Sequence, residues 1–145
     1  MSFGFSVGDF LADANLAHSL VCVLSDSRGS SKEYQLLMQE LDGIYRICIR
    51  LENITAADQM HASTLNAVVV HVKICKKVMK DFLTKIEKYQ KSLSVDGSGS
   101  KVVDACRKVQ WGFSKSSELV SLRYTLRQQL LSISVYLGLA GLYVS

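Results

Sequence analysis

Apolar residues recur at intervals of three and four along most of the chain, which is the spacing of one face of an α-helix. The longest such run steps by three and four without a miss and consists of Leu65, Val68, Val72, Cys75, Met79, Phe82, Ile86, Tyr89 and Leu93. This heptad seam predicts one long helix over residues 58–93. At 1.5 Å per residue that helix would be about 54 Å long, so either the bundle is elongated or this helix bends or projects from it.

Helical periodicity also covers residues 7–24, 31–52, 101–112 and a stretch from 118 toward the C-terminus. Capping-box spacing occurs at three expected helix starts, in the pairs Ser6/Asp9, Ser30/Glu33 and Thr55/Asp58. The glycine- and serine-rich segment 95–100 is the one clear flexible loop. Because short loops between long amphipathic helices favour antiparallel neighbours, we expect residues 1–145 to form a single all-α domain, an elongated up-and-down bundle of four to five helices.

Two stretches are apolar on more than one helical face. The helix expected at 7–24 is a candidate membrane-active or core helix, with Phe10, Leu11, Leu16, Leu20 and Val23 as its characteristic residues. Residues 128–145 carry no charge and approach the roughly 20 residues that span a bilayer, but serines and glycines interrupt them. We expect them to form a plain core helix. Trp111, beside Gly112, is expected to pack where the last two helices meet.

Composition agrees with a folded helical protein, since 48% of residues are apolar, 21% are charged and none is proline. The four cysteines lie on separate predicted helices and form no CxxC pair, so neither a zinc site nor a redox pair is indicated. No secretory signal is evident. The sequence therefore predicts reduced, buried cysteines in a cytoplasmic protein, with recruitment to a membrane as a further possibility.

Charge is divided unevenly along the chain. Residues 1–72 hold four Lys/Arg against eight Asp/Glu, whereas residues 73–145 hold thirteen against five. Within the long helix, a row of lysines forms the candidate contact with an anionic membrane or a partner: Lys73, Lys76, Lys77, Lys80, Lys85, Lys88 and Lys91. The alternative is an ordinary solvated helix face. Nucleic acid is the less expected partner, because the row has neither arginines nor interleaved aromatic residues.

The sequence does not predict an enzyme. It contains no phosphate loop, nucleophile elbow or zinc-binding motif, and we expect no cofactor and no metal. His61 and His71 would lie about 15 Å apart along one helix and could not share a metal; all three histidines are expected at the surface or its boundary. An enzyme would require a pocket that brings together several of four residues: Asp13, His18, Glu52 and His61.

Two stretches carry a family resemblance: MSFGFSVGDF at residues 1–10, and KVQWGF at 108–113 followed by Leu119, Leu122, Arg123 and Leu126. They resemble the fungal N-terminal helical domain that precedes NACHT-type NTPase, ankyrin or other modules, a group related to the HeLo and HeLo-like domains. The resemblance implies a helical bundle acting in fungal non-self recognition and regulated cell death.

Two functions are compatible with this resemblance. The first is a non-enzymatic signalling or effector domain that self-associates and targets anionic membranes. The alternative is a protein-binding or oligomerisation scaffold without membrane activity, for which the heptad seam could pair with another chain.

Overall fold

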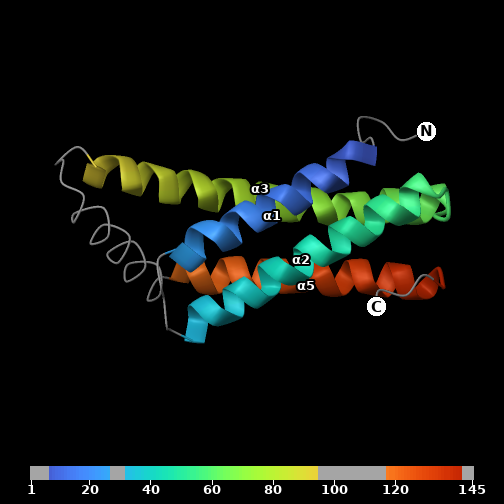
Figure 1. The fold of residues 1–145 in the computed structure, drawn as a ribbon. Helices are drawn as coiled ribbons and strands as arrows, with labels where there is room; N and C mark the ends of the chain where they lie inside the picture. Colours follow the sequence, from blue (N-terminus) through green and yellow to red (C-terminus); the bar gives the residue numbers. More distant parts are fainter. Residues whose placement is uncertain (1–6, 27–31, 95–116, 142–145) are drawn as a thin grey trace.

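The computed structural model describes residues 7–26, 32–94 and 117–141. They form four helices, α1 (Val7–Asp26), α2 (Lys32–Ala56), α3 (Ala62–Ser94) and α5 (Ser117–Leu139), and no strand occurs among them. The expected all-α, elongated up-and-down bundle is confirmed (Figure 1). The predicted helix at 101–112, the loop at 95–100 and Trp111 lie outside the described residues.

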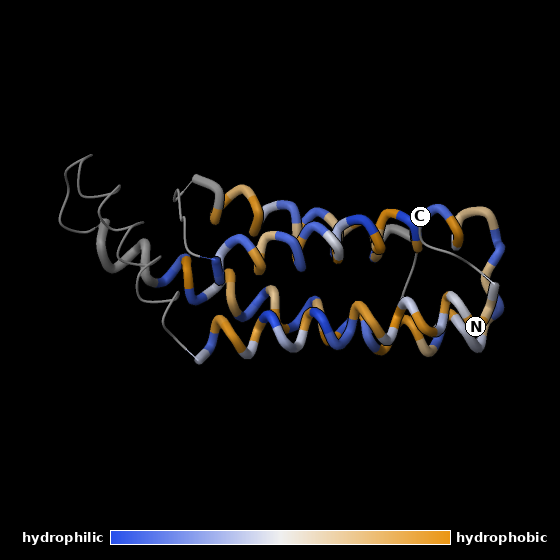
Figure 2. The backbone as a smooth tube through the Cα atoms, turned by 90° about the horizontal axis from the view of Figure 1, so that it is seen from below, coloured by the Kyte–Doolittle hydropathy of each residue, from blue (hydrophilic) through white to orange (hydrophobic). Residues whose placement is uncertain are grey.

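The four helices are arranged as two hairpins that pack on each other. α1 packs against α2, and α3 packs against α5; the hairpins then stack so that α1 contacts α3 and α2 contacts α5. Figure 2 shows the resulting two layers along a common long axis. α2 and α3 follow each other in the sequence but lie diagonally across the bundle, so residues 57–61 lead from one layer to the other.

The core lies along the common axis and is built from one apolar stripe of each helix. The buried part of the heptad seam on α3 consists of Val68, Val72, Cys75, Met79, Phe82 and Ile86. α2 buries a matching stripe that extends from Tyr34 to Ile54. Because the seam is buried within its own bundle, it is not available in this conformation to pair with another chain. α1 contributes two fully buried alanines, Ala14 and Ala17, whose small side chains allow close helix packing.

The connection between α2 and α3 differs from the sequence prediction. Thr55 and Asp58 were expected to cap the long helix, but Thr55 lies inside the last turn of α2 and α3 begins at Ala62. α2 extends this far because Ile54 continues its buried stripe. Asp58 is instead the residue that ends α2, with a φ of 53° in the left-handed region.

The backbone around Asp58 forms a Schellman motif. The Asp58 N–H donates to the Thr55 carbonyl at 3.0 Å, and the Gln59 N–H donates to the Ile54 carbonyl, also at 3.0 Å. These bonds satisfy carbonyls that the end of a helix otherwise leaves unpaired. The buried Met60 then anchors the turn against the core before α3 begins.

Candidate interaction surface

The lysine row of α3 lies on the surface, as expected. Five of its side chains are exposed and Lys76 is half-buried; the side chain of Lys91 lies outside the described residues. The exposed members are Lys73, Lys77, Lys80, Lys85 and Lys88. The heptad seam determines this placement, because burying one side of α3 turns the opposite side toward solvent.

The described ion pairs neutralise only part of the positive charge of the row. Lys85 Nζ lies 3.2 Å from Glu118 Oε1, and both side chains are about half exposed, so this pair contributes little stability. Within the described part of the chain, no ion pair is formed by Lys77, Lys80 or Lys88. The outer face of α3 therefore presents a positive surface to solvent.

Two exposed apolar residues interrupt this positive surface. Val70 is 56% exposed and Ile74 is 38% exposed. They precede Lys77 by seven and three residues, which places all three side chains on the same side of the helix. The row is thus part of a mixed basic and apolar surface. The heptad pattern did not indicate this feature, because Val70 and Ile74 lie outside the seam.

The candidate residues on α1 belong mainly to the core. Phe10 and Leu20 are buried, Leu16 and Val23 are half-buried against the core, and only Leu11 is exposed. Of the two roles open for this helix, the structure therefore supports the core role. A membrane-active role would require α1 to leave the bundle. None of the described helices is both long enough and apolar enough to cross a membrane.

α5 is apolar on two opposite sides. Its inner side is buried through Leu119, Leu122, Leu126, Ile133 and Leu137. Five apolar side chains on its outer side are each more than half exposed, and we call them the outer stripe: Val120, Tyr124, Leu131, Val135 and Leu139. The expectation that this segment forms a plain core helix is therefore wrong for the outer side of α5, which is exposed. α5 lies at the edge of a two-layer bundle, where only one side of a helix can be buried.

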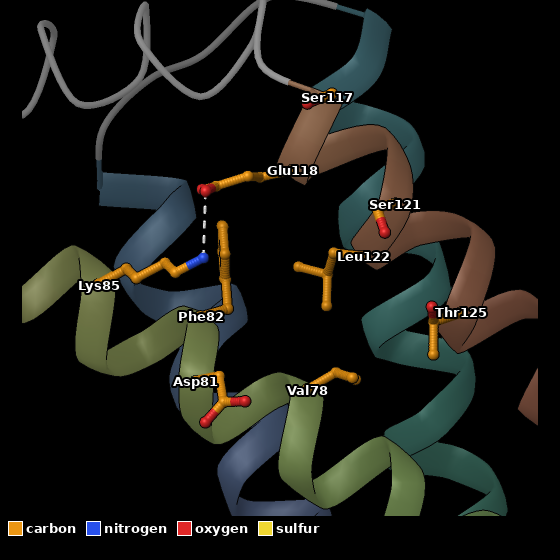
Figure 3. A pocket seen from close by; sticks show the side chains of 9 residues that line it. All are labelled: Val78, Asp81, Phe82, Lys85, Ser117, Glu118, Ser121, Leu122 and Thr125. Atoms are coloured by element: carbon orange, nitrogen blue, oxygen red, sulfur yellow. Dashed lines mark ion pairs between the residues drawn. The ribbon is translucent and has the colours of Figure 1, made fainter.

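A groove of about 360 Å³ lies between α3 and the first turns of α5 (Figure 3). Its floor is apolar, with Val78, Phe82 and Leu122, and the Lys85–Glu118 ion pair lies across its upper part. The Asp81 carboxylate of α3 and the hydroxyl groups of three α5 residues complete the lining, the latter from Ser117, Ser121 and Thr125. No histidine is among the lining residues, and the two carboxylates of the groove belong to Asp81 and to the ion-paired Glu118.

Among the residues that the structure describes, Asp13 is the one charged residue in the core, at 1% exposure. Neither of its carboxylate oxygens has a hydrogen-bond partner among the described residues. Burial raises the pKa of Asp13 to about 6; the positive charge of Lys76 opposes the rise, Asp9 adds to it and Lys80 opposes it. The sequence does contain a signal for this burial, because residue 13 lies on the same helical side as Phe10 and Ala17.

The thiols of two buried cysteines lie close enough to Asp13 for its negative charge to affect their pKa values. Burial, and secondarily the Asp13 carboxylate, raises the pKa of the Cys48 thiol well above its usual range and that of Cys75 to about 12. Both are therefore protonated and unreactive at neutral pH. Cys22 is exposed, which corrects the expectation that the cysteines are buried. Cys106 lies outside the described residues.

The histidines occupy separate environments near the surface, as predicted. The His18 ring contacts the Tyr45 ring, and Nδ1 of exposed His61 lies 3.1 Å from the Ser63 hydroxyl oxygen. His71 is half-buried between α3 and α5, where its Nδ1 lies 2.6 Å from Gln129 Oε1. Of the four residues that an enzyme's pocket would bring together, Asp13 is buried, Glu52 is half-buried, and His18 and His61 are exposed. None of the four lines the groove between α3 and α5.

The described part of the chain contains no group of three His, Cys, Asp or Glu residues that could hold a metal ion. Its two candidate contact surfaces are the mixed basic and apolar face of α3 and the outer stripe of α5. No family model, curated protein or solved structure matches the chain.

Proposed function

We propose that this chain is a non-enzymatic signalling or effector module of the HeLo-like type that binds anionic membrane surfaces through the lysine row of α3. The observation that carries the proposal is that exposed Val70 and Ile74 lie on the same long helix as Lys77, Lys80 and Lys88. These three lysines form no ion pair with another described residue. Lysines that flank apolar side chains are typical of helices that lie in the interface of an anionic bilayer. The resemblance of residues 1–10 and 108–113 to fungal HeLo-like domains supports the same assignment.

The length of α3 suits a contact parallel to the bilayer. Its 33 residues extend over about 50 Å at 1.5 Å per residue, so several lysines can reach headgroups together. Each lysine near an anionic leaflet contributes about 1 kcal/mol, and the contribution falls off within a Debye length. Burial of Val70 and Ile74 in the interface adds a hydrophobic contribution to the binding free energy, and salt does not screen this contribution.

Vesicle co-sedimentation tests the proposal. The full chain is mixed with vesicles of phosphatidylcholine alone and with vesicles containing about one third phosphatidylserine. We expect binding only to the anionic vesicles, and weaker binding as salt is raised. Replacing Lys73, Lys77, Lys80 and Lys88 with Gln should abolish that binding, because about 1 kcal/mol is lost for each.

The matched control changes the same number of positive charges elsewhere. Four exposed basic residues lie off α3 and serve for this purpose: Lys32, Arg46, Arg50 and Arg127. Their replacement with Gln should leave most of the vesicle binding in place. Equal loss of vesicle binding in both variants would show that the interaction depends only on the net charge of the protein. No binding by the unaltered chain would overturn the membrane proposal.

The scaffold alternative rests on a different part of the bundle than the sequence suggested. The heptad seam of α3 is buried, but the outer stripe of α5 is exposed and available to another protein. Loss of partner binding on mutation of α5, with no lipid binding by any variant, would favour the scaffold. An enzymatic function has no comparable support among the described residues.

A further inference from the structure

Asp13 lies where three helices meet. It belongs to α1, which packs against both α2 and α3, and its side chain is almost completely buried. The titratable groups that face it come from all three helices: Asp9 on α1, Cys48 on α2, and Cys75, Lys76 and Lys80 on α3. No described group donates a hydrogen bond to either carboxylate oxygen. A buried carboxylate without such donors is costly in its ionised form, so the fold favours the neutral form.

Two of these groups connect the buried carboxyl to the lysine row. Lys76 is half-buried and Lys80 is exposed, and their spacing of four residues places them on successive turns of the same side of α3. The negative charge of Asp13 attracts both ammonium groups and offsets part of their positive charge. Because Asp13 is buried, salt screens this attraction less than it screens an attraction between two exposed charges. The electrostatic potential of the row therefore depends on whether Asp13 is ionised.

We propose that Asp13 makes membrane binding by the lysine row proton-dependent, because proton uptake by this buried carboxyl frees the charge of Lys76 and Lys80 for anionic headgroups. This inference rests on the proposed membrane function and adds its regulation. The coupling is reciprocal, as any coupling between two binding events must be. Headgroups that neutralise the two lysines weaken their attraction for Asp13, so the membrane-bound protein holds the Asp13 proton more tightly than the free protein.

The direction of the pH effect follows from the environment of Asp13. Burial raises the pKa of its carboxyl to about 6, so the ionised form predominates at pH 7.5 and the neutral form at pH 5. Acidification therefore removes one negative charge from beside the row. One unit of charge near an anionic leaflet is worth about fivefold in affinity. Histidine side chains also gain positive charge over this pH range, so the test has to isolate the contribution of Asp13.

Vesicle co-sedimentation of the full chain at pH 5 and pH 7.5 provides this test. The vesicles contain about one third phosphatidylglycerol in phosphatidylcholine, since the phosphodiester of phosphatidylglycerol keeps its charge over this range. Asp13→Asn should bind about fivefold more tightly than the unaltered chain at pH 7.5 and equally tightly at pH 5. The ratio of the affinities at the two pH values should therefore be about fivefold smaller in this variant than in the unaltered chain.

Two further variants separate charge from shape and from position. Asp13→Ser places a smaller uncharged side chain in the core and should bind vesicles as Asp13→Asn does. Asp81→Asn removes the same charge from the exposed face of α3. It should raise the affinity by a similar factor at both pH values and leave their ratio as it is in the unaltered chain. Circular dichroism at both pH values should show the same helicity in every variant.

The outcomes distinguish this inference from the membrane proposal on which it rests. An equal pH ratio in the unaltered chain, Asp13→Asn and Asp13→Ser would assign the pH dependence to the histidines and overturn the inference, while the membrane proposal would stand. Binding at pH 5 to vesicles of phosphatidylcholine alone would show that acid exposes apolar surface, and this result would also overturn it. No binding to anionic vesicles at either pH would overturn both proposals.

Discussion

Gly43 of α2 lies directly against Leu130 of α5, where a Cβ at residue 43 would stand only 2.9 Å from the Leu130 Cδ2 atom. A glycine within a helix costs about 0.5–1 kcal/mol relative to alanine. Here the missing side chain allows α2 and α5 to approach closely. At this point α2 and α5 therefore meet through the backbone of α2 and the Leu130 side chain.

Enlarging residue 43 should separate α2 from α5. Gly43→Ala should change the free energy of unfolding by less than about 1 kcal/mol, because the end of the Leu130 side chain can rotate away while the helix gains propensity. Gly43→Leu cannot be accommodated in this way and should cost roughly 1–3 kcal/mol. Urea unfolding followed by circular dichroism measures both. If Gly43→Leu is as stable as Gly43→Ala, the close approach is absent in solution.

The buried Asp13 carboxyl should make the bundle less stable as pH rises. Its pKa is 3.8 when unperturbed and about 6 in the fold, so the folded state favours the protonated form. The fold is therefore unaffected by this group below about pH 4 and loses stability as pH rises to 6, by up to about 3 kcal/mol at 1.36 kcal/mol per pKa unit. Asp13→Asn should consequently raise stability at pH 7.5 and change it little at pH 4.

The control for this prediction is Asp81→Asn, which removes the same charge from the exposed face of α3. It should shift the free energy of unfolding by less than about 0.5 kcal/mol at either pH, as surface substitutions usually do. A pH dependence that is identical in the Asp13→Asn variant and the unaltered chain would show that Asp13 is ionised in the folded state without penalty.

Asp58 is held in a backbone conformation that suits glycine better. Its φ of 53° costs an L-residue up to about 1 kcal/mol, and its negative charge lies at the C-terminal end of the α2 dipole. We expect Asp58→Gly to stabilise the fold by about 0.5–1 kcal/mol, seen as a rise in Tm of a few degrees. Ala57→Gly, one residue earlier and also exposed, should lower the Tm instead.

Arg123 and Glu33 join the first half of α5 to the first turn of α2. The ion pair between Arg123 Nη1 and Glu33 Oε2 is partly shielded, since the arginine side chain is 22% exposed and the glutamate 39%. A double-mutant cycle with alanine at both positions should give a coupling energy of about 1 kcal/mol that decreases in 1 M salt. A coupling near zero would indicate that packing alone positions the start of α5.

The fold was largely predictable because most helices bury one side only. The unbroken seam from Val68 to Ile86 identified the buried side of α3 correctly, and the opposite lysine row followed from it. The capping prediction at Thr55 and Asp58 was wrong because a four-residue pattern is local, whereas the end of α2 depends on whether Ile54 can be buried. Tertiary packing determined that boundary.

The candidate surface was predictable only in part. Periodicity showed that α5 is apolar on two sides, but it could not show which side faces solvent, because that depends on how many neighbours the helix has. Val70 and Ile74 posed the same difficulty, since an exposed valine and a buried one look alike in a sequence. The lysines were easier to place because a charge is rarely buried without a partner.

The diagonal step between α2 and α3 has a kinetic consequence. Residues 57–61 are the whole covalent link between the layers, so each hairpin experiences the other at an effective concentration in the millimolar range expected of a short linker. If the layers separate during an opening event, they meet again within the same molecule far faster than they find another molecule. Exchange of whole hairpins between copies is therefore suppressed at micromolar protein concentrations.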